Sequence, residues 1–127
     1  MSVSENDPRL AEAIDLFNAH EYFACHDVLE EIWSETLSDE REFLQGLIHA
    51  AVSLFHFTEG NFGGARKMHD SAVRYLSPFQ PSCLGIELNE FLQQFDVCFQ
   101  PLLGKHQSYP TDISVDESLI PKLSKNQ

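Results

Sequence analysis

Apolar residues recur along this chain with the three- and four-residue spacing of amphipathic helices. The spacing predicts helices over about residues 8–18, 22–36, 40–59, 62–76 and 84–102. Within the third segment, residues 43–57 carry no formal charge and are hydrophobic on nearly every side. A helix with this pattern is buried over most of its surface, so we expect the other helices to pack around it.

Residues that start and stop helices lie at the ends of these segments. Asp7 is a favourable N-cap residue, and it is followed by a proline at the first helical position. Gly60 is placed to end the third helix, and Asn61 to cap the fourth. The sequence therefore predicts an all-α fold, a compact bundle of about five helices built from two helical hairpins and a C-terminal helix.

The predicted bundle occupies most of the chain. We expect residues 1–103 to form a single helical domain and residues 104–127 to form an irregular C-terminal tail, in which the apolar segment 119–123 docks onto the bundle. Residues 17–25 can also be laid over residues 57–65, because both contain a hairpin turn with an aromatic residue on either side. This weak repeat indicates two similar hairpins and falls short of a solenoid, which needs about three repeats.

The net charge of −12 is spread unevenly. Residues 1–42 hold 12 of the 20 acidic residues and only Arg9 and Arg41 as basic residues, so this third of the chain carries −10. Such a field repels phosphate groups, which disfavours a nucleic-acid partner. It is compatible with a basic protein partner, with a bound cation, or with an acidic surface that keeps the protein in solution.

The cysteines and the N-terminus bear on the compartment. Three cysteines without a metal-binding spacing indicate neither a disulfide framework nor a zinc knuckle. The first residues lack the basic and apolar segments of a signal peptide, and residues 43–57 are shorter than the ~18–20 apolar residues of a membrane span. We expect a cytoplasmic protein with no membrane span.

Two titratable residues fall on the apolar side of the helix predicted over residues 22–36. Phe23 and Leu37 extend the apolar arc of this helix, and His26 and Glu30 lie inside the extended arc, one turn apart. Burying an ionised carboxylate is costly unless it is paired. We therefore expect Glu30 to point inward and to pair with His26 or with a polar group of the next helix.

The next helix supplies candidate partners, because Gln45, His49 and His56 share one of its sides. In an antiparallel hairpin this side can face His26 and Glu30. Two or three imidazoles with one carboxylate can bind zinc, iron, nickel or manganese. His26, Glu30 and His56 are therefore candidate ligands for a divalent transition metal.

Three interpretations of this cluster stay open. It is a structural network in which every buried polar group is hydrogen-bonded, a pocket for a small ligand or substrate, or a metal site. The pocket would be lined by His26, Glu30, Trp33, Gln45 and His56. The remaining histidines, His20, His69 and His106, are expected at the surface or at its boundary.

Several spaced motifs match a known family. They are Phe17-Asn18, Tyr22-Phe23, His26-Asp27, Leu29-Glu30 and Trp33, then Phe43-Leu44-Gln45-Gly46-Leu47-Ile48, Ala51, His56, Gly60-Asn61 and Gly64-Ala65. Through them, residues 9–76 resemble the small helical proteins described as domain of unknown function 309 (DUF309). The resemblance implies an all-helical bundle in a bacterial, archaeal or plastid setting, and no established activity. It places the family's polar signature on His26, Glu30, Gln45, His56 and Asn61, which adds Asn61 to the candidate pocket and leaves His49 outside the signature.

Two functions are compatible with these observations. One is an uncharacterised cytoplasmic protein whose His/Glu pocket, between the second and third helices, binds a small ligand or a metal ion. The other is a helical-hairpin module for protein–protein interaction or homo-oligomerisation, in which His26 and Glu30 are purely structural. Spacing alone identifies no catalytic nucleophile and no phosphate-binding loop, so the sequence leaves open whether the protein is an enzyme.

Overall fold

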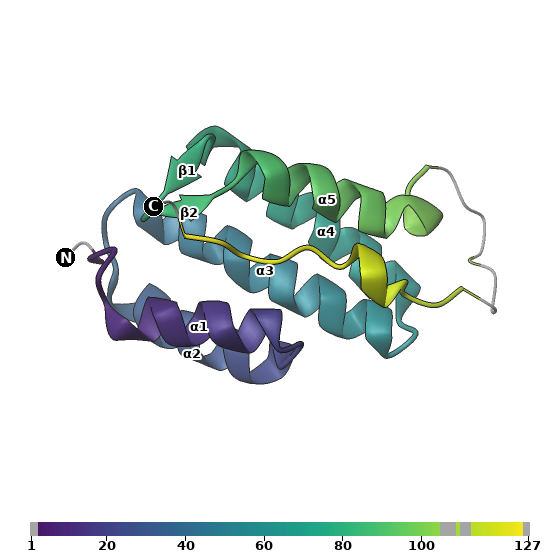
Figure 1. Ribbon diagram of the computed structural model, residues 1–127, viewed down its shortest axis with the longest axis horizontal. Helices are drawn as coiled ribbons and strands as arrows, with labels where there is room; N and C mark the ends of the chain where they lie inside the picture. Colours follow the sequence, from purple (N-terminus) through teal and green to yellow (C-terminus); the bar gives the residue numbers. More distant parts are fainter. Residues whose placement is uncertain (1–2, 105–108, 110–112, 126–127) are drawn as a thin grey trace.

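The computed structural model describes residues 3–104, 109 and 113–125, and in these ranges the chain folds as an all-helical protein (Figure 1). Its α-helices are α1 (Pro8–Asn18), α2 (Tyr22–Glu35), α3 (Glu40–Thr58), α4 (Phe62–Leu76) and α5 (Asn89–Phe99). Short 3₁₀ turns follow at η1 (Ser77–Phe79), η2 (Gln100–Leu102) and η3 (Glu117–Leu119). The only sheet among the described residues pairs β1 (Ser82–Cys83) with β2 (Ile86–Glu87). The predicted fold class is confirmed.

The third helix lies in the middle of the molecule, with the α1–α2 hairpin on one side and α4 and α5 on the other (Figure 1). Buried residues cover most of the circumference of α3, apart from the partly exposed side that carries Gln45, His49 and His56, which confirms the prediction of a central helix. The buried residues are Phe43, Leu44, Gly46, Leu47, Ile48, Ala50, Ala51, Ser53, Leu54 and Phe57. Burying so much apolar surface in one helix supplies much of the favourable free energy of folding.

The two hairpin turns are built alike, as the weak repeat predicts. At the α1–α2 turn the rings of Phe17 and Tyr22 meet edge to face at 5.6 Å, and at the α3–α4 turn Phe57 and Phe62 do so at 6.1 Å. Each turn also contains one residue with positive φ, His20 at 64° and Gly60 at 77°. An aromatic pair therefore closes each hairpin where the chain passes through the left-handed conformation.

Helix capping follows the sequence signals. The Asp7 side chain accepts a hydrogen bond from the Arg9 amide at 2.9 Å, and Asn61 Oδ1 accepts one from the Gly64 amide at 3.1 Å. Each bond satisfies an N–H group that the first turn of a helix leaves without a partner inside the helix. Gly64 also makes room for its capping residue, because an added Cβ there would lie 2.7 Å from Asn61 Nδ2.

The prediction of a last helix over residues 84–102 is wrong at its start, whereas at its end α5 continues into the 3₁₀ turn η2 up to Leu102. Leu84 and Gly85 have φ values of 51° and 76° and form the turn of the β1–β2 hairpin, so α5 begins only at Asn89. Ile86 and Leu88 are both buried. Their two-residue spacing is that of a strand and its end, which the helical interpretation of this segment overlooked.

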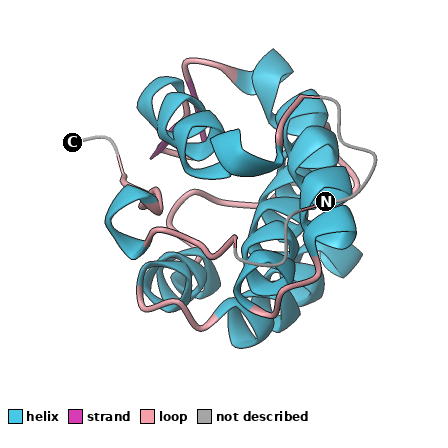
Figure 2. Cartoon of the chain, turned by 90° about the vertical axis from the view of Figure 1, so that its right-hand side faces the viewer, coloured by secondary structure: helices cyan, strands magenta, loops and turns pink. Residues whose placement is uncertain are grey.

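The C-terminal segment returns along the bundle and lies between α1 and α5 (Figures 1 and 2). The Asn18 side chain donates a hydrogen bond to the Leu123 carbonyl at 2.9 Å and accepts one from the Leu123 amide at 2.8 Å. Leu123 is buried, and Lys125 forms a β-bridge with Ile86. The end of the segment expected to dock is therefore held to α1 and to the small sheet.

None of the helices in the described part of the chain combines the length and the hydrophobicity needed to cross a bilayer.

Candidate functional site

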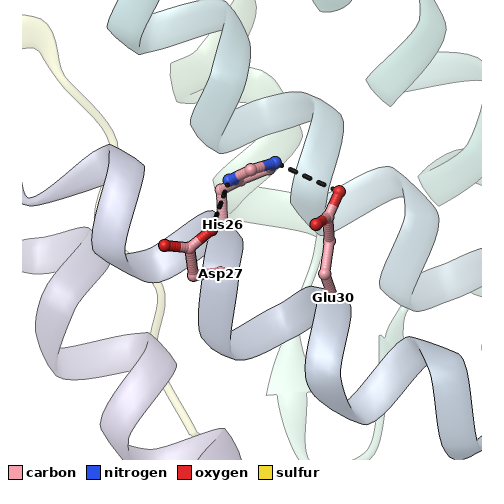
Figure 3. A group of neighbouring side chains, drawn as sticks. All are labelled: His26, Asp27 and Glu30. Atoms are coloured by element: carbon pink, nitrogen blue, oxygen red, sulfur yellow. Dashed lines mark ion pairs between the residues drawn. The ribbon is translucent and has the colours of Figure 1, made fainter.

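Helix α2 places His26 between two carboxylates (Figure 3). Its Nε2 lies 3.1 Å from Glu30 Oε1, one helical turn further on, and its Nδ1 lies 3.3 Å from Asp27 Oδ1. The Asp27 contact lacks hydrogen-bond geometry, since Nδ1 is a buried atom with no hydrogen-bond partner. The imidazole is mostly buried, whereas both carboxylates are largely in solvent.

The expectation that Glu30 points into the interior is wrong. Its side chain is 54% exposed, so its charge stays hydrated while it contacts His26. The error comes from counting Phe23 and Leu37 as core positions, because these residues are 62% and 76% exposed. The buried side of α2 is narrower, and Glu30 lies outside it; its members are Tyr22, Cys25, Leu29 and Ile32.

A hollow of about 180 Å³ opens between α2 and α3 next to His26. Its lining is aromatic or aliphatic apart from two imidazole rings, and consists of Tyr22, Phe23, His26, Val52, Phe55 and His56. The Phe23 ring lies 5.6 Å from the ring of His26 and 6.1 Å from that of Phe55, tilted by 50° and 57°. Phe55 in turn lies 6.1 Å from His56. Four rings therefore follow one another around this opening.

His56 also contacts Asn61, the residue that caps α4. Asn61 Nδ2 lies 3.3 Å from His56 Nδ1, while Asn61 Oδ1 accepts the hydrogen bond from the Gly64 amide. Because the amide oxygen is used by the cap, the NH₂ group is the one that faces His56 and donates to Nδ1. A neutral His56 then carries its proton on Nε2.

Gln45 and Trp33 lie outside the hollow. Gln45 contacts His49, whose Nε2 is 2.7 Å from Gln45 Nε2 and whose Nδ1 is 2.7 Å from Ser71 Oγ of α4. The Gln45 amide NH₂ donates to Nε2 of a neutral His49 that carries its proton on Nδ1, and Nδ1–H then donates to Ser71 Oγ. Trp33 instead packs under Arg41, whose guanidinium carbon is 3.9 Å from the indole centroid.

The environment of His49 favours its neutral form. Burial lowers the pKa of His49, and the nearby positive charge of Arg74 lowers it further. Its ring meets Tyr75 edge to face at 5.5 Å. His49 thus belongs to the contact between α3 and α4.

The structure brings four of the six candidate residues into one region. His26 and His56 line the hollow, Glu30 contacts His26, and Asn61 contacts His56. Phe23 and Phe55 belong to the same site, but they are not among the site residues predicted from the sequence. The available signal was their spacing, since Phe23 lies three positions before His26 and Phe55 directly before His56.

The prediction that His69 lies at the surface or its boundary is wrong. It is buried, with Nδ1 2.9 Å from Asp70 Oδ1 and Nε2 2.8 Å from Asp96 Oδ1 of α5. Its ring packs against Phe95 and Phe99 at 4.7 and 4.9 Å. His20 is exposed as predicted, and His106 lies outside the described residues.

Comparison with known proteins shows a match to a known family over this region. The model of the family described as Domain of unknown function (DUF309) matches residues 10–68, from α1 into α4, which confirms the resemblance. The uncharacterized protein YpuF of Bacillus subtilis (strain 168) is 33% identical over 64 residues, which are 50% of this chain and 37% of that protein. An uncharacterized protein of Aquifex aeolicus (strain VF5) is 29% identical over 91 residues, 71% of this chain and 27% of that protein. The chain thus spans about a third or less of the curated relatives it matches.

Proposed function

Residues 10–68 match the DUF309 family model, and we propose that the hollow between α2 and α3, inside this matched region, binds the positively charged head group of an organic cation, such as an alkylated ammonium. The observation that carries the proposal is the combination of an apolar, aromatic hollow with two carboxylates beside it. Asp27 and Glu30 both lie against His26, which forms part of the wall.

The volume limits the size of the ligand. At about 30 Å³ per water-sized group, 180 Å³ holds roughly six non-hydrogen atoms. Pockets for whole drug-sized molecules and cofactors measure about 300–1,000 Å³. The hollow therefore suits a head group or the end of a side chain, with the rest of the ligand outside.

The walls favour a cation over a neutral group of the same shape. Phe23 and Phe55 offer aromatic rings to the opening, and a cation over such a ring gains about 0.5–2 kcal/mol. Asp27 and Glu30 add an attraction that acts over several ångströms at low ionic strength. An alkylated ammonium ion satisfies both, because its methyl groups contact the rings while its charge faces the carboxylates.

A pair of shape-matched ligands tests this proposal. Choline and its neutral isostere 3,3-dimethylbutan-1-ol are titrated into ¹⁵N-labelled protein, and amide shifts are followed. We expect choline to shift amides of α2 and α3 around the hollow and to bind ~2- to 30-fold more tightly than the isostere, the factor that 0.5–2 kcal/mol gives. Equal affinity for both ligands, or shifts confined to other helices, would contradict the proposal.

Two substitutions separate the aromatic from the electrostatic contribution. Phe23→Leu keeps an apolar side chain but removes the ring, and Glu30→Gln keeps the shape but removes the charge. Both should weaken choline binding and leave the isostere unaffected within about twofold. Glu12→Gln, which removes an exposed carboxylate from α1, is the matched control and should leave both affinities unchanged.

A metal ion is a second candidate, favoured by one observation. Ligand atoms of His26, Asp27 and Glu30 all lie within 4.8 Å of one another. The two carboxylates, however, face opposite nitrogens of the same ring, and one ion can use only one of these nitrogens. Binding through all three residues therefore requires a side chain to rotate, so this geometry supports a metal less well than an organic cation.

Calorimetric titration with Zn²⁺ and with Mn²⁺ tests the metal site. Micromolar binding that is lost in His26→Ala and kept in His20→Asn would favour it over the organic cation. Binding that is the same in both variants would assign the heat to another part of the protein.

A further inference from the structure

We propose that the cation is a lysine side chain of a partner protein, presented by a basic amphipathic helix that lies along α2. This inference rests on the proposed function, because the lysine would occupy the same hollow. It adds a source for the cation and a surface for the rest of the partner.

One side of α2 offers a continuous, solvent-exposed stripe. Phe23, Asp27, Glu30 and Ser34 follow one another at spacings of three and four residues and are all exposed. Leu37 is exposed just beyond the end of the helix. From residue 23 to the end of α2 at residue 35 the stripe is about 18 Å long at 1.5 Å per residue. A partner helix of about three turns covers this length.

The apolar residues at the two ends of the stripe are unusually exposed. Among the described residues, four large hydrophobic side chains are at least 40% exposed, and Phe23 and Leu37 are the most exposed of them at 62% and 76%. The other two, Val97 and Leu119, lie on other elements. Leaving an aromatic ring in water forgoes part of the roughly 1.5–3 kcal/mol that its burial would contribute. Aromatic residues of this kind are enriched among the anchors of protein interfaces.

The charges along the stripe indicate where the lysine would enter. Arg9 donates hydrogen bonds to Glu31 at 3.3 Å and to Glu35 at 2.8 Å, so the acidic residues near the end of α2 already have a cationic partner. For Asp27 and Glu30, the ion pairs in the described ranges are with His26. Within α2, the acidic residues that have no arginine or lysine partner in the described ranges are therefore the two beside the hollow.

These features define the partner by its chemistry. Its helix carries one lysine that enters the hollow, further basic residues within a turn of it that face Asp27 and Glu30, and an apolar residue about three turns away that contacts Leu37. Charge complementarity selects this helix over a neutral one, since residues 1–42 carry −10.

A designed peptide tests the inference on the full chain. The probe is a fluorescent, alanine-based helical peptide with this pattern of lysines and one leucine, compared with a peptide in which norleucine replaces only the lysine meant for the hollow. Fluorescence anisotropy at low salt should show binding that weakens at least ~5-fold for the norleucine peptide. It should weaken to a similar degree for the Phe23→Ala and Glu30→Gln proteins.

Matched controls keep the test specific. Val97→Ala removes a comparably exposed apolar side chain from α5, and Glu12→Gln removes a carboxylate from α1; both should change the affinity less than twofold. Phe23 is exposed, so its substitution should leave the far-UV circular dichroism unchanged. Equal weakening by target and control variants would overturn the inference, because it would show binding to the general negative charge.

The outcomes also separate this inference from the proposed function. Choline binding without peptide binding would overturn the helix partner and leave the cation site standing. Failure of both would remove both proposals. A concentration-dependent dimer in sedimentation that Phe23→Ala abolishes would show that a second copy of the chain covers this surface, and would overturn the basic helix as its occupant.

Discussion

A histidine that packs against two phenylalanine rings links α4 to α5. His69 has a carboxylate oxygen within 3 Å of each ring nitrogen, and its ring lies against both Phe95 and Phe99, which also contact each other at 4.9 Å. The side chain is only 5% exposed, so its apolar contacts and its hydrogen bonds both count toward stability. Few other close contacts join these two helices, which makes this residue important for holding α5 in place.

Replacing His69 by alanine should lower the free energy of unfolding by about 2–3 kcal/mol, because it leaves a cavity and removes hydrogen bonds to Asp70 and Asp96. Urea denaturation followed by circular dichroism measures the change. Asp96→Asn is the matched variant, since its amide oxygen still accepts a hydrogen bond, and should cost less than about 1 kcal/mol. A loss below ~0.5 kcal/mol in His69→Ala would contradict this role.

A second histidine should make stability depend on pH. Burial and Arg74 lower the pKa of His49 in the folded protein below its unfolded value of about 6.5. The unfolded state therefore binds the proton more readily, so the stability associated with His49 is present above pH ~6.5 and is lost as the pH falls through the folded pKa.

The urea midpoint should accordingly fall between pH 7.5 and pH 5.5, and it should fall less in His49→Gln, which cannot titrate. His20→Asn is the control, because His20 is exposed and asparagine tolerates its positive φ. Its pH dependence should match that of the unchanged protein. An identical drop in His49→Gln would show that other groups cause the pH dependence.

At the scale of the elements, α3 and α4 approach each other closely at one glycine. A Cβ added to Gly46 would lie 2.7 Å from both Cγ and Cδ2 of Leu76 and 3.1 Å from Tyr75 Cβ. Leu76 is fully buried and has little room to move. By contrast, a Cβ on Gly63, in the first turn of α4, would meet nothing within 4 Å.

These two glycines should respond to alanine in opposite directions. Gly46→Ala should destabilise by about 1–3 kcal/mol through overpacking, even though alanine is the better helix former. Gly63→Ala should stabilise by up to ~1 kcal/mol, because only helix propensity and chain entropy change. Thermal and urea unfolding of the pair measure both effects. A neutral Gly46→Ala would mean that the two helices separate easily.

The elements also differ in how well local pattern predicted them. Helices α1 to α4 lie close to their predicted ranges, because their apolar residues and caps occur within a few residues of one another. The β1–β2 hairpin escaped prediction because Leu84 adopts a positive φ that its side chain alone does not suggest. The partners of Ile86 are Cys83 and the distant Lys125.

At the scale of the whole molecule, two similar hairpins are closed by segments from the other half of the chain. The Asn18 side chain, at the end of α1, forms hydrogen bonds with both the amide and the carbonyl of Leu123. Lys125 Nζ donates a hydrogen bond to the carbonyl of Glu5. The N- and C-terminal parts of the described chain are therefore tied together. The α2–α3 hollow and the exposed stripe of α2 are formed by residues other than those that make these contacts.

The sequence by itself determined the helical class, the central position of α3, the capped hairpin turns and the acidic character of the first third. These depend on spacing and composition, which a helix converts directly into faces and ends. It also singled out His26, Glu30 and His56. Only the tertiary structure decided that Glu30 stays in water, that His69 is buried, and that Phe23 and Phe55 join the two histidines around one hollow. Helical periodicity shows which residues share a side, but which side another helix covers depends on how the helices pack.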